Sequence, residues 1–230
     1  MTSTQLPLNL NLQDDAIFDN FEVGENALCL HALKNMVTQG NEQFIYCYGA
    51  SGVGRSHLLQ ACCHLASQNN RSVFYLPLSA YTDFSPAILE SLENVSLVCV
   101  DDIDKIMGNH AWEEALFHFY NRARDRDAVL LVSAVLPPQQ LPCILNDLRS
   151  RLSCALSFEI KNLNDVEKMH ALQMRAGLRG MQLPDEVAHY LISHFSRNMR
   201  DLFTVLDKLD RTSLIAKRKI TMPFLKQVMR

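Results

Sequence analysis

The stretch GASGVGRS at residues 49–56 constrains the fold more than any other part of this 230-residue chain. It departs at one position from the phosphate-binding pattern G-x-x-x-x-G-K-[ST], because Arg55 stands where that pattern has lysine. The apolar run FIYCYG at 44–49 precedes it, and a helical pattern from Arg55 to Ser67 follows. A glycine-rich loop between a strand and a helix predicts a cradle of backbone N–H groups for phosphate oxygens, at the positive end of the helix.

A pair of acidic residues supports the same interpretation. The run LVCVDD at 97–102 places Asp101 and Asp102 at the end of an apolar strand, where ligands of α/β sheets bind. Asp101 is expected to hold Mg²⁺ together with the Ser56 hydroxyl, and Asp102 to polarise an attacking water. Arg55 keeps the positive charge of the missing lysine, but its guanidinium is bulkier than an ammonium group. We therefore expect the site to bind nucleotide and to turn it over poorly.

Apolar runs alternate with helical patterns up to about residue 160. Strands are expected at 44–49, 72–78, 97–102, 128–134 and 154–160, and helices at 26–39, 55–67, 85–93, 111–126 and 145–150. Because the strands are apolar on both faces, they predict a parallel sheet covered by helices. After residue 162 only helical patterns remain, at 164–179, 184–196, 198–209 and 221–229. We expect a flexible arm at 1–15, an α/β core at 16–160 and a helical lid at 161–230.

The composition narrows the setting in which the chain works. It is 48% hydrophobic, and no apolar run reaches the ~18 residues that would span a bilayer. The N-terminus lacks a signal-peptide pattern, so a cytoplasmic protein without membrane partners is expected. The seven cysteines show no CxxC spacing, which favours small buried thiols over metal ligands or disulfides.

The net charge of −3 is unevenly spread along the chain. Residues 1–160 carry a net charge of −9, whereas residues 161–230 carry +6. A basic lid could meet nucleic acid or an acidic partner, or it could be an ordinary solvated helical surface.

Several segments, taken together and in order, resemble AAA+ proteins of the DnaA clade over essentially the whole chain. They are FDNFEVGENA (18–27), GASGVGRSHL (49–58), LVCVDDID (97–104), LLVSAVLPP (130–138), LRSRL (148–152) and NMRDLFTVLDKLD (198–210). The resemblance implies the AAA+ form of the P-loop NTPase fold, an αβα core with a parallel sheet followed by a small helical lid.

The resemblance also implies roles for individual residues. Ser133 matches the sensor 1 position near the γ-phosphate, and Arg200 matches sensor 2, which reaches from the lid to the phosphates. Arg151 in LRSRL matches the arginine finger, which acts on the nucleotide of a neighbouring subunit. The residues expected to contact nucleotide are Phe18, Phe21, Val23, Gly49, Ser51, Gly52, Val53, Gly54, Arg55, Ser56, His57 and Arg200.

Within that clade the chain is most similar to the regulators rather than to the initiators. DnaA carries a C-terminal helix-turn-helix domain that is not expected among residues 1–230, and DnaA has lysine where Arg55 stands. The resemblance implies an adaptor that holds ADP or another nucleoside diphosphate and presents Arg151 to ATP bound by DnaA. The ADP form of DnaA that results would be inactive, which would restrain replication initiation. The sequence leaves open whether the chain also forms a homodimer that buries Arg151.

The expected arm contains QLPLNL at 5–10, which resembles the peptide motif that docks on the bacterial DNA polymerase sliding clamp. Gln5 would bind a polar pocket, and Leu6, Leu8 and Leu10 would supply apolar anchors. The chain would then meet DNA indirectly, through the clamp.

Two other functions remain as alternatives. Asp102 retains a catalytic type of acid, which favours a self-acting ATPase such as a helicase loader. The basic lid would suit a DNA-binding module, whose binding would depend strongly on salt.

Overall fold

A five-stranded parallel sheet forms the centre of the molecule in the computed structural model, which describes residues 12–229 except 14, 41, 93 and 127. The strands are β1 (Phe44–Tyr48), β2 (Val73–Pro77), β3 (Leu97–Asp101), β4 (Val129–Ala134) and β5 (Leu156–Glu159). Their order is β2-β3-β4-β1-β5, and every neighbouring pair is parallel. The predicted α/β core with a parallel sheet is confirmed.

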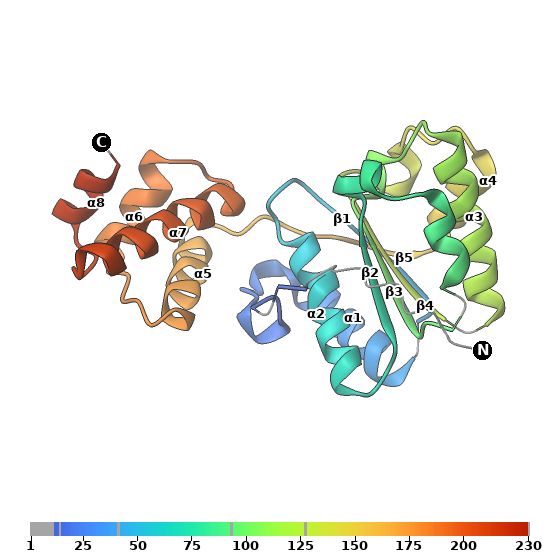
Figure 1. The fold of residues 1–230 in the computed structure, drawn as a ribbon, viewed down its shortest axis with the longest axis horizontal. Coiled ribbons are helices and arrows are strands. Elements are labelled where there is room, and N and C mark those ends of the chain that lie inside the picture. The colour runs from blue at the N-terminus through green and yellow to red at the C-terminus, as the bar shows by residue number, and fades with distance from the viewer. Residues whose placement is uncertain (1–11, 14, 41, 93, 127, 230) are drawn as a thin grey trace.

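Helices cover both faces of this sheet, as the all-apolar strands predict. On one face lie α1 (Ala27–Gln39) and α2 (Arg55–Gln68), and on the other α3 (His110–Asp125) and α4 (Asn146–Ser153) (Figure 1). β3 and β4 are buried along their whole length because they lie at the middle of the sheet, whereas the edge strand β5 is largely exposed.

Four helices form the lid, with an apolar core of its own. They are α5 (Asp165–Leu178), α6 (Asp185–His194), α7 (Met199–Ala216) and α8 (Met222–Val228) (Figure 1). α7 extends beyond the predicted end at 209 because Leu209 and Ser213 continue its buried face. Asn164 begins α5 with a reciprocal capping box, in which Asn164 and Glu167 exchange side-chain and backbone hydrogen bonds.

Two expectations change in detail. The segment predicted as a helix at 85–93 forms a 3₁₀ helix, Pro86–Ser91, instead of an α-helix. The last residues of the expected arm contact both the core and the lid: the backbone N–H of Gln13 donates to Gln60 on α2 over 2.8 Å, and Asp15 pairs with Arg175 on α5 at 3.3 Å. The clamp motif, with Gln5, Leu6, Leu8 and Leu10, lies outside the described residues.

Candidate nucleotide site

The loop at 49–54, called here the phosphate loop, connects β1 to α2 and brings its glycines into positive φ. Gly52 has φ +86° and Gly54 has φ +98°, and Gly54 is the N-cap of α2. These conformations suit glycine because residues with a Cβ rarely adopt them. The loop thus points the amino end of α2, with its unpaired N–H groups, into a cavity.

That cavity, of about 290 Å³, lies between the phosphate loop and the lid. It brings together predicted groups from three separate parts of the chain: the phosphate loop with the start of α2, the end of β3, and the first turn of α7. The predicted residues that line it are Ser51, Gly52, Gly54, Arg55, Ser56, His57, Asp102 and Arg200. Arg200 projects from the first turn of α7, so the predicted sensor 2 arginine faces the phosphate loop across this space.

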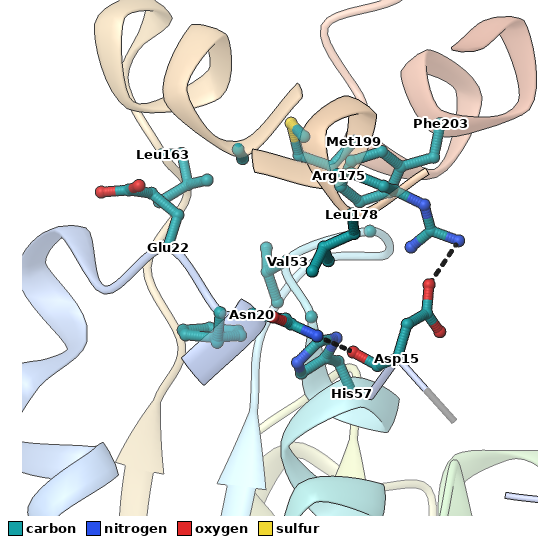
Figure 2. Close-up of a pocket in the computed structure, with 14 residues that line it drawn as sticks. Asp15, Asn20, Glu22, Val53, His57, Leu163, Arg175, Leu178, Met199 and Phe203 are labelled. Carbon is teal, nitrogen blue, oxygen red and sulfur yellow. Dashed lines mark hydrogen bonds and ion pairs between the residues drawn. The ribbon is translucent and has the colours of Figure 1, made fainter. Parts of the chain in front are cut away.

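A second, smaller and largely apolar cavity of about 80 Å³ adjoins the first (Figure 2). Phe21 and His57 line it from the core, and Leu178 and Met199 from the lid. Their rings and aliphatic side chains suit the flat apolar face of a nucleoside base. Of Phe18, Phe21 and Val23, which lie in one segment and are all expected to contact nucleotide, the structure places Phe21 alone at this cavity.

The other two residues of that segment lie elsewhere. Phe18 is buried in the core beneath α1, with the Lys34 ammonium 5.1 Å from its ring centroid. Val23 is 38% exposed and does not line this cavity.

Two glycines of the phosphate loop also allow close packing by residues far away in sequence. An added Cβ on Gly54 would lie 2.6 Å from the Phe21 ring, and one on Gly52 would lie 2.1 Å from Oδ1 of Asn198. The loop is therefore enclosed on one side by the N-terminal segment and on the other by the lid.

Arg55 lies inside the site rather than on its rim. Its side chain is 8% exposed, and its Nη2 lies 2.9 Å from Oδ1 of Asp102. The two groups are at ion-pair distance but not aligned as a hydrogen bond, so Asp102 Oδ1 has no hydrogen-bond partner among the described residues. Arg55 Nη1 also makes no hydrogen bond there, and it lies 4.0 Å from Oδ1 of Asp104. Burial and the Asp101 carboxylate raise the pKa of Asp102, although the Arg55 charge opposes them.

Asp101 is held by two hydroxyl groups, one from each of the strands β2 and β4. Tyr75 Oη donates to its Oδ2 over 2.7 Å, and Ser133 Oγ donates to its Oδ1. Ser133 Oγ also accepts the Asp102 backbone N–H at 2.9 Å, which places the predicted sensor 1 residue against both acids. Burial, together with the Asp101 carboxylate, raises the pKa of Tyr75, so this hydroxyl stays a donor.

These contacts bear on the two ligands predicted for the site. The glycine-rich cradle and the buried Nη1 of Arg55, which makes no hydrogen bond among the described residues, fit a phosphate group. They do not fit the predicted Mg²⁺, because Asp101 is 3% exposed with both oxygens engaged and Asp102 faces Arg55. The Ser56 hydroxyl is the remaining member of that predicted donor set. Among the described residues, no three His, Cys, Asp or Glu side chains gather into a metal site.

Arg151 lies on α4, which packs on α3, and it does not line either cavity. Within the described part of the chain, its guanidinium makes no hydrogen bond or ion pair. Arg151 therefore lies apart from Arg55, which begins α2, and from Arg200, which is on α7 of the lid.

The start of α4 is fixed by a buried carboxylate that the sequence analysis missed. Glu113, fully buried on α3, accepts the backbone N–H groups of Gly108, Ile144 and Leu145 at 2.7–3.1 Å. Burial alone would raise the pKa of Glu113, but these hydrogen bonds hold it below its usual value. In sequence, Glu113 looks like an ordinary polar residue on a helix, and no pattern distinguishes it from its neighbour Glu114.

Three more residues of the site escaped notice. Tyr75 lies within an expected strand, and Asn198 is the first residue of the helix expected at 198–209. Arg175 reads as one of the many cations of the lid, but its guanidinium carbon lies 4.4 Å from the Phe203 ring centroid and it lines both cavities. A periodic helical pattern places Arg175 on a face of α5 but cannot show what that face meets.

The model of the bacterial DnaA ATPase domain matches residues 12–159, and the model described as "Hda, lid domain" matches residues 165–229. Among solved structures, domain III of the Thermotoga maritima replication initiation protein DnaA is 22% identical with a TM-score of 0.85, covering 95% of this chain and 97% of that one. AMPPCP-bound DnaA from Aquifex aeolicus is 22% identical with a TM-score of 0.72, covering 85% of this chain and 65% of that one.

A RuvB variant from Thermotoga maritima shares the fold at 18% identity and a TM-score of 0.69, covering 93% of this chain and 71% of that one. None of the helices in the described part of this chain is long and apolar enough to cross a membrane.

Proposed function

Because this chain belongs to the family of the bacterial DnaA ATPase domain, as a DnaA-like AAA+ protein of the Hda type, we propose that it is a regulatory adaptor that stimulates hydrolysis of DnaA-bound ATP. Arg151 acts as the arginine finger, in trans, and the product is inactive ADP-bound DnaA. The outcome is negative regulation of replication initiation. The hydrolysing site belongs to the partner, and this chain's own site holds a nucleotide that stabilises the competent fold.

The single observation that carries this proposal is the difference between two arginines. Arg55 is buried against Asp102 in the chain's own site, whereas Arg151 is partly exposed and unpaired within the described residues. A guanidinium without a partner is available to a phosphate of another subunit. Positive charge beside the γ-phosphate stabilises the transition state of phosphoryl transfer, and such fingers contribute ~10³–10⁵ in rate.

The chain's own nucleotide is proposed to be ADP or another nucleoside diphosphate. The DnaA of Aquifex aeolicus was solved with AMPPCP, an ATP analogue, which supports nucleotide binding in this fold. Here the phosphate loop and Arg55 contact the phosphates, and Arg200 approaches them from the lid. Asp102 is proposed to be inactive as a base, because its carboxylate pairs with Arg55 and is not available to activate a water molecule.

Docking on the DNA polymerase sliding clamp is proposed for the motif at residues 5–10. Clamp pulldown with Gln5→Ala and Leu8→Ala should be lost, whereas Asn9→Ala, which lies between two anchor positions, should bind as the wild type does. Retained binding by the first two variants would contradict this assignment.

The central test measures hydrolysis of ATP bound to DnaA, in the presence of clamp loaded on DNA. The wild type should stimulate it, and Arg151→Ala should not. Arg211→Ala, which removes an exposed arginine from α7, is the matched control and should stimulate as the wild type does. An unchanged rate with Arg151→Ala would overturn the proposal. Rapid ATP turnover by the isolated chain would instead support a self-acting ATPase, such as a helicase loader.

A further inference from the structure

The side-chain amide of Asn198 links the lid to the phosphate loop through both of its polar atoms. Its Nδ2 donates to the backbone carbonyl of Ser51 over 2.8 Å. Its Oδ1 accepts the backbone N–H of Arg200 at 2.9 Å, as the cap of α7. One planar group therefore joins the loop to the backbone of the arginine that faces it.

The chemistry of the two partners fixes the orientation of this amide. Ser51 offers a carbonyl and Arg200 offers an N–H, so rotating the amide by half a turn would place oxygen against oxygen and nitrogen against nitrogen. The Asn198 backbone N–H donates to Ser196 Oγ at 3.0 Å, which holds the approach to α7 as well.

The close approach depends on a glycine in the phosphate loop. Oδ1 of Asn198 occupies the position that a Cβ of residue 52 would need, at 2.1 Å. Gly52 thus serves the lid contact in addition to its backbone conformation of φ +86°. The sequence explains Gly52 by the loop alone, so this second role becomes visible only in the tertiary structure.

We propose that Asn198 is a positioning residue that holds Arg200 over the phosphate loop, so that loop and lid close on a bound nucleoside diphosphate as one unit. This inference rests on the proposed nucleotide site, because it requires Arg200 to contact the phosphates. Without the bond to Ser51, α7 would remain capped, but its first turn would no longer be fixed relative to the loop.

Asn198→Asp separates the two roles of the side chain. Aspartate caps a helix as well as asparagine does, so α7 keeps its start. The variant loses the donor to Ser51, however, and sets an oxygen against that carbonyl. We expect its thermal unfolding to stay close to that of the wild type, and its affinity for ADP, measured by calorimetry, to fall about tenfold.

Asn164→Asp is the matched control, because Asn164 caps α5 in the same way and lines neither cavity. It should bind ADP like the wild type.

A double-mutant cycle with Arg200→Ala provides a readout that a purely structural role would not move. If Asn198 acts through Arg200, the double variant should bind ADP no more weakly than Arg200→Ala alone. Full additivity of the two losses, or wild-type affinity of Asn198→Asp, would overturn the inference and leave the nucleotide site intact. Failure of the wild type itself to bind ADP would overturn the nucleotide site, and this inference with it.

Discussion

The guanidinium of Arg55 lies 2.9 Å from the carboxylate of Asp102, so the cation that follows the phosphate loop and the acid that follows β3 neutralise one another. In a phosphate loop with lysine, the compact ammonium group approaches the β- and γ-phosphates. The longer, forked side chain of Arg55 instead reaches across to the end of β3. The pair connects the departure in the loop motif with the acid that would otherwise activate water.

Shortening the cation should separate nucleotide binding from turnover. In Arg55→Lys we expect ADP affinity to be kept and ATP hydrolysis by the chain alone to rise, because Asp102 loses its partner. Arg55→Ala should bind ADP about 10–100-fold more weakly, the loss expected for a charge-assisted hydrogen bond. Calorimetry and a phosphate-release assay measure the two effects. Equal binding by Arg55→Ala and the wild type would show that Arg55 does not contact the phosphates.

Removal of divalent cations should change nucleotide binding little. Asp101 has both oxygens engaged by Tyr75 and Ser133, and Asp102 faces Arg55, so the carboxylates are not arranged to hold Mg²⁺. We expect chelation by EDTA to change the affinity for ADP by less than about threefold. A larger loss that added Mg²⁺ restores would instead support the Ser56 and Asp101 metal site predicted from the sequence.

Stability should fall on mild acidification because of His57. Its Nε2 donates to the Ile17 carbonyl over 2.8 Å, and burial lowers its pKa below the ordinary value of 6.5. The unfolded state therefore binds more protons below pH 6.5, and the free energy of unfolding decreases as the pH falls from 6.5 toward the lowered pKa of the folded state.

Denaturant unfolding at several pH values measures this effect. His57→Gln should flatten the dependence between pH 6.5 and the lowered pKa, while His110→Gln, on an exposed side chain, should leave it unchanged. An unaltered slope in His57→Gln would rule out His57 as its source.

The carboxylate of Glu113 should matter to the fold far more than its neighbour in sequence. In Glu113→Gln, the amide NH₂ replaces one carboxylate oxygen, so a backbone N–H group that now donates to Glu113 loses its acceptor and faces another donor. We expect a loss of about 3 kcal/mol, which corresponds to a fall in Tm of roughly 6–12 °C. Glu114→Gln removes an exposed carboxylate that pairs with two histidines and should cost less than ~0.5 kcal/mol. Calorimetric melting of the two variants gives the comparison, and equal Tm values would contradict the anchoring role of Glu113.

Much of the site could be predicted because its motifs are local. The glycines of the phosphate loop, Arg55 and the pair Asp101 and Asp102 each follow a strand, and parallel strands carry their carboxyl ends to one edge. The role of Arg200 could be predicted from the segment in which it lies, and the structure shows that Arg200 and the phosphate loop line the same cavity. Phe18 and Val23 show the limit of this approach, because a segment can border a cavity while alternate side chains turn away from it.

The sequence by itself determined the class of fold, the order of its elements and the chemistry available in the loop, because periodicity and glycine placement act over a few residues. Only the tertiary structure decided which groups meet: Arg55 with Asp102, Tyr75 with Asp101, Glu113 with the start of α4, and Asn198 with the phosphate loop. Such pairs join residues from 26 to 147 positions apart, and their formation depends on how helices and strands pack, which no local pattern encodes.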